Sequence, residues 1–442
     1  MSMSSQPKSY GIAAVALAFA AGILLTLGLK DLYPDFERRH QRRGGQKTSS
    51  SSSRPTSTYL PPVKLENRTR SSQPSARSLP VPEGIEGCIG NTPLFKIRSL
   101  SEATGCTILA KAEFLNGAGG SPKDRVALNM IRMAEEEGLL VPGRGDTIYE
   151  GTVGSTGISL ATLARALGYK AHICMPNDQS KEKSDLLHHL GAEVESVTPA
   201  PITSTDHFVN LARRRAAEHT ASREGDSRGF FADQFDSLAN YRAHWKSTGP
   251  EIWQQTGGQI DAFVAGAGTG GTVSGISKYL KEDMGMGRAL QVVLADPEGS
   301  GLYNKVKHGV MFSPTEKEGT RRRQQVDTIV EGIGINRLTE NFEAGRELID
   351  DAVQVTDRQA LTMARWLVEK DGIFVGSSSA VNCVAAVVTA LRMPAESRVV
   401  TILCDGGTRH LSKFWKQVGE LGEEEGHGEA GLLQLLNIET ER

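Results

Sequence analysis

The sequence is poor in aromatic residues and cysteines, and it carries almost no net charge. Its 442 residues include 6% aromatic residues and five cysteines, and the formal net charge is −2. A nearly neutral chain gives no reason to expect a nucleic-acid surface, so we expect no nucleic-acid partner. The cysteines are odd in number, and none follows a C-x-x-C spacing. They indicate reduced, mostly buried thiols in a cytosol-like compartment and argue against a disulfide framework or a metal site.

Charged residues are also missing from one long stretch near the N-terminus. Residues 11–29 form an uncharged run of 19 residues, close to the roughly 20 that a membrane-spanning helix needs. Lys8 is the one basic residue before this run, whereas several follow it between positions 30 and 43. This asymmetry predicts a membrane anchor with the rest of the chain on the cytosolic side. The alternative is a cleaved signal peptide, for which the run is long.

The remaining chain divides by composition. We expect a tail over 1–10, a disordered basic linker rich in Ser and Pro over 30–83, a globular unit over 84–420 and a frayed tail over 421–442. Strand-like and helical runs alternate in the globular unit, which predicts an α/β fold with parallel sheets and flanking helices. The clearest strands are 170–176, 261–268, 290–296 and 398–405, the clearest helices are 125–138, 272–282 and 358–372, and 308–326 is typical of a charged loop.

The turn "EGTVGSTGISLA" (150–161) lies between a strand-like run and a helical run. Backbone N–H groups at such a helix N-terminus bind anions. The residues alone leave open whether the anion is a cofactor phosphate, a nucleotide or a substrate carboxylate.

The stretch "NGAGGSPKDRVA" (116–127) places a lysine in the first turn of a predicted helix. Ser121 is expected to be the N-cap, Pro122 the first helical residue and Asp124 the acidic member of a capping pattern. The helix dipole and any burial then lower the pKa of the Lys123 ammonium. A neutral amine is what Schiff-base chemistry requires. The alternative is a surface Lys–Asp–Arg triplet on an amphipathic helix.

The stretch "GAGTGGTVSG" (266–275) follows an apolar strand and matches G-x-G-x-x-G. With Asp296 at the end of the next strand, it fits a dehydrogenase that binds a nicotinamide cofactor. The hydroxyls of Thr269 and Thr272 fit a single compact phosphate at least as well.

A third stretch, "FVGSSSAVN" (374–382), places three serines between a short strand and a helix. They fit either a helix N-cap with spare hydroxyls or a hydroxyl directed at a cofactor ring.

Together and in this order, the motifs resemble the fold-type-II pyridoxal-phosphate family, in its cysteine synthase and cystathionine β-synthase branch. The likeness covers about 84–420, and within the branch it is greatest to the membrane-anchored fungal cysteine synthase-like proteins. The motifs that carry it are GNTPL (90–94), SPKDR (121–125), GTVGSTG (151–157), LGAEV (190–194), DQF (233–235), TGPEIW (248–253), GAGTGGT (266–272), EGIG (331–334) and GSSSA (376–380).

The resemblance implies a two-domain fold similar to the tryptophan synthase β-subunit, with a smaller mobile subdomain at about 125–232, pyridoxal 5′-phosphate as cofactor and a homodimer. Lys123 matches the Schiff-base lysine, and Ser378 matches the serine at the pyridine nitrogen, with Ser377 as the alternative if the register slips. The cofactor phosphate is matched to Gly268, Thr269, Gly270, Gly271 and Thr272. The substrate carboxylate and its surroundings are matched to Thr152, Val153, Gly154, Ser155, Thr156, Gln234 and Gly332, with Ser155 also near the cofactor.

The implied reaction is a β-replacement that makes L-cysteine from O-acetyl-L-serine and sulfide, with Lys123 as general base. The alternatives are replacement or elimination on serine, as in cystathionine synthesis or a dehydratase, and a catalytically weak membrane-anchored scaffold. The resemblance suggests mitochondria, with the enzyme on the outer membrane facing the cytosol.

The carboxylate loop departs from the family pattern. The family usually shows T-S-G-N-T, whereas this chain has T-V-G-S-T, so Val153 replaces a hydroxyl and Ser155 replaces an amide. Losing one charge-assisted hydrogen bond costs about 1.5–3 kcal/mol. There is also one additional residue between Asn116 and Ser121, and Ala380 stands where glycine is common. These departures leave the native substrate pair open.

Overall fold

The computed structural model describes residues 81–179, 181–222, 225–311, 328–421 and 431–438. The expected N-terminal tail, the membrane anchor, residues 30–80 of the linker and residues 312–326 of the charged loop lie outside these ranges. No helix within them is long and apolar enough to cross a membrane.

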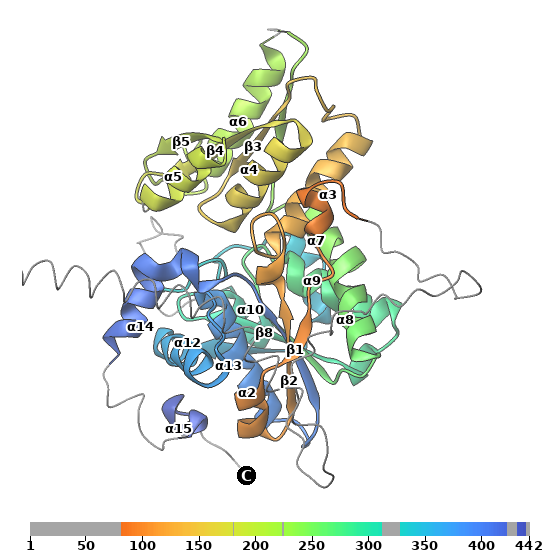
Figure 1. The fold of residues 1–442 in the computed structure, drawn as a ribbon, viewed down its shortest axis with the longest axis vertical. Helices are drawn as coiled ribbons and strands as arrows, with labels where there is room; N and C mark the ends of the chain where they lie inside the picture. The colour runs from red at the N-terminus through yellow and green to blue at the C-terminus, as the bar shows by residue number, and fades with distance from the viewer. Residues whose placement is uncertain (1–80, 180, 223–224, 312–327, 422–430, 439–442) are drawn as a thin grey trace, which may run out of the picture. The chain divides into compact units, whose positions relative to one another are not determined.

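The larger of two sheets among the described residues has the strand order β1-β2-β10-β7-β8-β9 (Figure 1). Its strands are β1 (Leu94–Lys96), β2 (Thr107–Ala112), β7 (Ala262–Gly266), β8 (Gln291–Pro297), β9 (Asp351–Val355) and β10 (Arg398–Leu403). β1 is antiparallel to β2, and the other neighbours are parallel. Because β10 lies between β2 and β7, the segments that follow these three strands meet at one edge of the sheet.

Buried residues alternate between the two faces of this sheet. Val264 packs with α2, α12 and α13 on one face, whereas Phe263 packs with α8, α9 and α10 on the other. These helices are α2 (Arg98–Thr104), α8 (Gly249–Thr256), α9 (Gly271–Lys278), α10 (Leu302–His308), α12 (Asp357–Asp371) and α13 (Ser377–Leu391). A parallel sheet covered on both faces is the arrangement that the alternating runs predict.

The smaller sheet has the order β5-β4-β3-β6 within the described ranges, and its neighbouring strands are all parallel. Its strands are β3 (Thr147–Gly151), β4 (Lys170–Pro176), β5 (Glu193–Val197) and β6 (Gly229–Phe231). α3 (Lys123–Glu136), α4 (Ser155–Leu167) and α5 (Lys181–His189) pack on one face, and α6 (Phe208–Ala221) packs on the other. The remaining helices are α7 (Ala239–Ala243), α11 (Glu340–Glu343), α14 (Lys416–Glu420) and α15 (Leu432–Leu435).

The expectation of a frayed C-terminal tail was wrong for its described part. Leu432 and Leu436 are buried in the same core as α12 and α13. The side-chain amide of Gln359 donates to the Leu436 carbonyl at 3.0 Å. Two buried leucines therefore pack α15 against the core of the larger sheet, although the sequence just before this helix is charged and rich in glycine.

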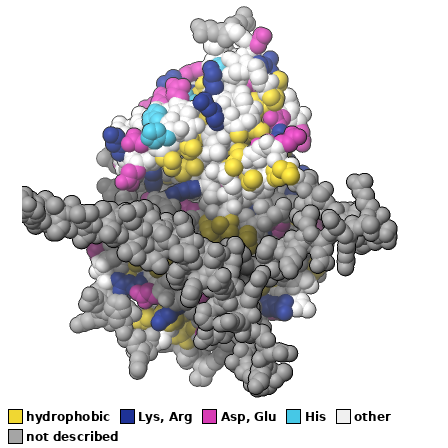
Figure 2. All heavy atoms as spheres, in the orientation of Figure 1, with side chains coloured by type: hydrophobic (Ala, Val, Ile, Leu, Met, Phe, Trp, Pro, Cys, Tyr) yellow, Lys and Arg dark blue, Asp and Glu magenta, His cyan; other side chains and the backbone are white. Residues whose placement is uncertain are grey.

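Charges of both signs are interspersed on the visible face that carries the smaller sheet (Figure 2). No field of one sign covers the described part of that face. This pattern agrees with the nearly neutral net charge of the sequence.

Candidate active site

Lys123 is the first residue of α3, and the loop before it is fastened to Asp124. The Asp124 carboxylate accepts from the N–H groups of Gly119 and Gly120 at 2.8 and 2.9 Å and from the Ser159 hydroxyl at 2.6 Å. The helix begins at Lys123, one residue later than expected, with Pro122 as its N-cap residue. The contacts of the predicted capping pattern are nevertheless present, because the Ser121 hydroxyl accepts from the N–H of Lys123 at 3.2 Å and the Asp124 carboxylate lies within hydrogen-bonding reach of the Ser121 N–H. Together with the two glycine contacts, these bonds fix the chain just before Lys123.

The Lys123 side chain is half-buried near the ends of the larger sheet. Loss of hydration lowers the pKa of its ammonium, and the negative charge of Asp405 opposes this shift. Burial raises the pKa of the neighbouring Cys404 thiol to about 12, so this thiol carries no charge at neutral pH. Lys123 therefore has a larger neutral fraction than an exposed lysine, as a nucleophile and base requires.

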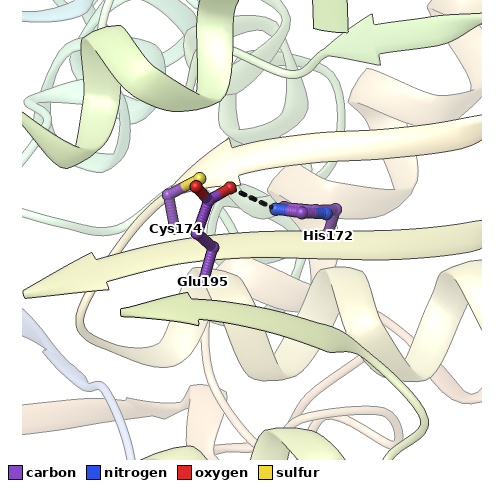
Figure 3. Close-up of side chains that lie close together, drawn as sticks. All are labelled: His172, Cys174 and Glu195. Atoms are coloured by element: carbon purple, nitrogen blue, oxygen red, sulfur yellow. Dashed lines mark hydrogen bonds and ion pairs between the residues drawn. The ribbon is translucent and has the colours of Figure 1, made fainter. Parts of the chain in front are cut away.

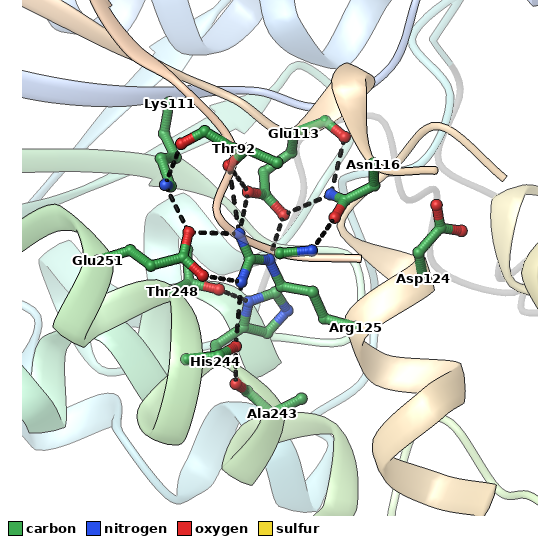
Figure 4. Close-up of polar contacts among 12 residues, drawn as sticks. Thr92, Lys111, Glu113, Asn116, Asp124, Arg125, Ala243, His244, Thr248 and Glu251 are labelled. Carbon is green, nitrogen blue, oxygen red and sulfur yellow. Dashed lines mark hydrogen bonds and ion pairs between the residues drawn. The ribbon is translucent and has the colours of Figure 1, made fainter. Parts of the chain in front are cut away.

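A buried network of ion pairs around Arg125 holds the first turn of α3 in place (Figure 4). Arg125 donates to both oxygens of Glu113 at 2.8 Å and to both oxygens of Glu251 at 2.6 and 2.8 Å. Lys111 also donates to Glu251, at 2.6 Å. Although burial opposes it, these hydrogen bonds hold the pKa of Glu251 down to about 2. Two bidentate pairs leave little freedom in the backbone that carries Lys123.

The loop between β7 and α9 is closely packed. A Cβ on Gly268 would lie 2.3 Å from the Gly332 carbonyl, and one on Gly271 would lie 2.1 Å from Oδ1 of Asn240. Gly270 has a φ of +86°, which glycine adopts without strain. The first N–H groups of α9 have no acceptor within the helix, and the helix dipole favours an anion there. This cradle fits a compact phosphate.

Thr272, in the first turn of α9, connects this cradle to a buried histidine. Its hydroxyl lies 3.2 Å from Nε2 of His244, whose Nδ1 lies 2.9 Å from the Thr248 hydroxyl. Burial lowers the pKa of His244, and the nearby charge of Lys123 acts in the same direction. His244 is therefore neutral, and its ring is held between the hydroxyls of Thr272 in the α9 cradle and Thr248.

The three serines at 377–379 lie in the first turn of α13 and differ in their contacts. The Ser377 hydroxyl accepts from the N–H of Glu331 at 3.0 Å, and the Ser379 hydroxyl accepts from the N–H of Cys404 at 2.8 Å. Ser378 is buried and lies within hydrogen-bonding reach of the Cys404 thiol. The N-cap interpretation was wrong, because Gly376 is the N-cap and no side chain caps the helix.

The loop at 152–156 connects β3 to α4. Thr156 donates to Oε1 of Gln234 at 2.6 Å, and both side chains are buried. Val153 is 37% exposed. The Ser155 hydroxyl lies 3.4 Å from Nη1 of Arg409. No side chain caps α4 at Gly154, so the first N–H groups of this helix can hold a carboxylate.

Asn240 joins this region to the α9 cradle. Its amide donates to the Gln234 carbonyl at 2.7 Å and to the Thr269 hydroxyl at 2.8 Å. Gly332, with a φ of +87°, lies against Gly268 on the other side. The cradle at 268–272 is thus connected to Gln234 through Asn240, and Gln234 to the loop at 152–156 through Thr156, with Gly332 packed against Gly268.

Five residues of this site were not predicted from the sequence: Asn240, His244, Cys404, Asp405 and His410. Cys404 and Asp405 directly follow the buried strand β10, and ligands bind at the carboxyl ends of parallel strands. That position was a readable signal. Asn240 and His410 lie in short helical turns, and nothing in their local sequence marks them.

Asp296, the residue that supported a dinucleotide site, has a structural contact. It is fully buried, and its Oδ2 accepts from the N–H of Tyr303 at 2.7 Å, in the first turn of α10. Burial raises its pKa to about 7. This carboxylate holds a helix end rather than facing the α9 cradle.

A separate cluster of His172, Cys174 and Glu195 lies on the α6 side of the smaller sheet (Figure 3). Nε2 of His172 lies 3.0 Å from Glu195. Arg215 donates to both oxygens of Glu195, at 2.8 and 3.0 Å. The guanidinium already neutralises the carboxylate that a metal would need, so this cluster is an ion-paired part of the sheet.

The sequence profile described as "Pyridoxal-phosphate dependent enzyme" matches residues 85–405. The chain therefore belongs to this family, and pyridoxal 5′-phosphate is its cofactor. A Neurospora crassa protein named "Cysteine synthase 2" is 69% identical over 96% of this chain and 95% of its own length. An Emericella nidulans protein of the same name is 59% identical over 97% of this chain and 98% of its own length.

A solved structure titled "Crystal structure of O-ureido-L-serine synthase" has the same fold. It aligns with a TM-score of 0.65 and 30% sequence identity, over 78% of this chain and 98% of the solved one. This match confirms the expected α/β architecture with two sheets.

Proposed function

We propose that this protein is a pyridoxal-phosphate-dependent β-replacement enzyme that makes L-cysteine from O-acetyl-L-serine and sulfide. The observation that carries the proposal is Lys123, a half-buried lysine whose pKa is lowered by burial. Its electrostatic neighbours are Cys404, which lies near Ser378, and His244, which lies at the α9 cradle. The names of the Neurospora crassa and Emericella nidulans relatives support the reaction.

The residues of the site fit the cofactor. The cradle formed by Gly268, Thr269, Gly270, Gly271 and Thr272 would hold the phosphate, because the first N–H groups of α9 have no acceptor within the helix. Ser378 would face the ring nitrogen, as the family resemblance implies, and the hydroxyls of its neighbours Ser377 and Ser379 each accept from a backbone N–H group. When bound through Lys123, the cofactor supplies an electron-withdrawing ring that stabilises negative charge at the substrate Cα.

The remaining residues bind and orient the amino acid. The N–H groups at Gly154, Ser155 and Thr156, with Gln234, hold its α-carboxylate. Once Lys123 is no longer bonded to the cofactor, its neutral amine removes the proton at Cα and later returns it. Its lowered pKa increases the fraction of the amine that is neutral. The Gly332 backbone lies beside the cradle and contacts the substrate. Compared with the usual T-S-G-N-T loop of the family, Val153 and Ser155 leave fewer polar groups that reach the substrate carboxylate or the cofactor.

A product assay separates this reaction from its alternatives. The purified enzyme is incubated with O-acetyl-L-serine and sulfide, with L-serine and sulfide, and with L-serine alone, and cysteine and pyruvate are quantified. Cysteine from O-acetyl-L-serine at a much higher rate than from L-serine supports the proposal. A preference for L-serine favours the serine-dependent enzyme, and no turnover with bound cofactor favours a scaffold.

We also propose the organisation that surrounds the site. Residues 1–10 are a tail, 11–29 the membrane anchor, 30–83 a linker, 84–420 the catalytic unit with a smaller subdomain at about 125–232, and 421–442 a C-terminal segment. The uncharged run at 11–29 and the basic residues after it support an anchor with the catalytic unit facing the cytosol. A Saccharomyces cerevisiae relative, 55% identical over 82% of this chain, carries "mitochondrial" in its name, which supports a mitochondrial location, and we place the anchor in the outer membrane from the family resemblance.

Two experiments test this organisation. Carbonate extraction of membranes should leave the full-length protein in the pellet and release a variant that lacks residues 11–29; release of both contradicts the anchor. Light scattering of the purified enzyme should give the mass of a homodimer, which we propose from the family resemblance.

A further inference from the structure

Asn240 is a fully buried amide that donates two hydrogen bonds. It lies in α7 and is 0% exposed. Its Nδ2 lies 2.7 Å from the Gln234 carbonyl oxygen and 2.8 Å from the Thr269 hydroxyl. Because a carbonyl oxygen can only accept, the group that faces Gln234 is the NH2 of the amide. The second hydrogen of this NH2 is left for Thr269, so Asn240 donates to the hydroxyl and does not accept from it.

The oxygen of the same amide has no donor. Oδ1 of Asn240 is buried and has no hydrogen-bond partner among the described residues, and a Cβ on Gly271 would lie 2.1 Å from it. Burying an amide oxygen without a donor is costly, and such groups in native structures need an explanation. The orientation of this side chain therefore serves more than stability. Glycine at 271, the first residue of α9, leaves the space that this orientation needs.

Thr269 is held so that its hydroxyl hydrogen remains available. Its side chain is buried, and its backbone carbonyl accepts from the Thr339 hydroxyl at 2.7 Å. Its own hydroxyl oxygen accepts from Asn240, and no group in the described part of the chain accepts from this hydroxyl. A hydroxyl that receives a hydrogen bond must direct its own hydrogen elsewhere. Thr269 stands in the turn just before α9, whose first N–H groups have no acceptor within the helix.

Asn341 holds the same segment without contacting this hydroxyl. Its amide donates to the Gln234 carbonyl at 3.2 Å, and its Oδ1 accepts from the Tyr241 N–H at 3.0 Å. Within the described ranges it forms no hydrogen bond with Thr269. Both asparagines therefore hold Gln234, and the contact that distinguishes Asn240 is the one to the Thr269 hydroxyl.

We propose that Asn240 is a positioning residue that makes the Thr269 hydroxyl a hydrogen-bond donor to the cofactor phosphate at the α9 cradle. By donating to the hydroxyl oxygen, Asn240 directs the hydroxyl hydrogen towards the anion. The same amide holds Gln234, so the phosphate site and the substrate carboxylate site share one rigid side chain. The proposal rests on the proposed function in one respect, which is that the α9 cradle binds the cofactor phosphate.

The test compares two ligands that differ only in the phosphate. Cofactor-free full-length protein is titrated by visible absorbance with pyridoxal 5′-phosphate and with pyridoxal, which lacks the phosphate and can still bond to Lys123. One hydrogen bond to a charged group is worth about tenfold in affinity. In Asn240→Ala we therefore expect binding of pyridoxal 5′-phosphate to weaken about tenfold and binding of pyridoxal to stay within about twofold of the wild type.

Thr269→Val tests the hydroxyl directly. Valine has the shape of threonine without the hydroxyl, so it should weaken binding of pyridoxal 5′-phosphate by a similar factor and leave pyridoxal unaffected. Adding Asn240→Ala to Thr269→Val should then cause no further loss, because the hydroxyl that Asn240 orients is already absent.

Asn341→Ala is the matched control. It removes a buried asparagine that donates to the same Gln234 carbonyl and leaves the Thr269 hydroxyl in contact with Asn240. The ratio of its two dissociation constants should equal that of the wild type. If Asn240→Ala does not fold, Asn240→Ser removes the same amide with a smaller loss of volume and is measured in its place.

An unchanged ratio of the two dissociation constants in a folded Asn240 variant would overturn the proposal, as would a further loss when Asn240→Ala is added to Thr269→Val. Failure of the proposed function gives a different pattern. If the wild type binds pyridoxal as tightly as pyridoxal 5′-phosphate, the α9 cradle does not bind the phosphate. If Thr269→Val lowers the preference for pyridoxal 5′-phosphate and Asn240→Ala does not, the role of Asn240 alone is wrong.

Discussion

The hydroxyl of Thr156 donates a hydrogen bond of 2.6 Å to Oε1 of Gln234, and both residues are buried. This bond joins the first turn of α4 to the segment that contains Gln234. The side-chain amides of Asn240 and Asn341 hold that segment by donating to the Gln234 carbonyl. Two parts of the proposed carboxylate site, 78 residues apart, therefore hold each other in place.

Thr156→Val should weaken amino-acid binding more than it changes the chemical step. The substitution leaves Gln234 with an unsatisfied oxygen at a cost of about 1–3 kcal/mol. We expect KM for O-acetyl-L-serine to rise about tenfold with a small change in kcat, and Thr156→Ser to restore binding. Thr162→Val, at a half-buried threonine of the same helix whose hydroxyl bonds only the Ile158 carbonyl, is the control, and an equal rise in KM there would contradict the specific role.

Val153→Ser should improve binding of the amino acid. Val153 is 37% exposed, so a hydroxyl can be introduced without opening the core. One hydrogen bond to a carboxylate is worth about 1.5 kcal/mol or more, which corresponds to about a tenfold lower KM. A KM that stays constant or rises would show that this position does not face the substrate. Val153→Ala controls for the lost side-chain volume.

Lys183→Met should loosen the contact between α5 and the segment that carries Gly332. Lys183 and Glu331 form an ion pair of 3.0 Å in which both side chains are partly exposed. Such pairs contribute about 0.2–1 kcal/mol and weaken with salt. We expect a two- to fivefold higher KM at low salt, and a difference that shrinks at high salt. Lys181→Met on the same helix should behave as the wild type at both salt concentrations.

Stability at acidic pH should depend on Glu251. Its pKa is lowered to about 2 in the folded protein, against the usual value of 4.5. A lowered pKa stabilises the fold above the unfolded value, and this contribution is lost as pH falls from 4.5 towards 2. Glu251→Gln should therefore unfold at a lower temperature near pH 7 and lose less stability on acidification, measured by circular dichroism. Parallel pH curves for the two proteins would contradict this role.

Much of the fold and part of the site could be predicted from sequence. The strand over 170–176 was confirmed with the same bounds, and the helix over 358–372 was confirmed within one residue. The cradle at 268–272 spans the turn after β7 and the first two residues of α9, and its glycines and the flanking periodicities are local signals.

Three features depend on contacts that local sequence does not encode. Asp124 reaches the Ser121 backbone as the predicted capping pattern requires, but its carboxylate also binds Gly119 and Gly120, because the loop folds back over it. Asp405 and His410 pair only after β10 and the turn that follows it are in place. The charged composition after residue 420 hid the two leucines of α15 that pack against the larger sheet.

The role of Lys123 in a β-replacement reaction is tested most directly by the visible absorbance of the purified enzyme. The wild type should show a cofactor band that changes on addition of O-acetyl-L-serine and returns when sulfide is supplied, with release of cysteine. Lys123→Ala should lack both the band and the response. A wild-type band that O-acetyl-L-serine leaves unchanged, or a Lys123→Ala variant that reacts as the wild type does, would contradict this role.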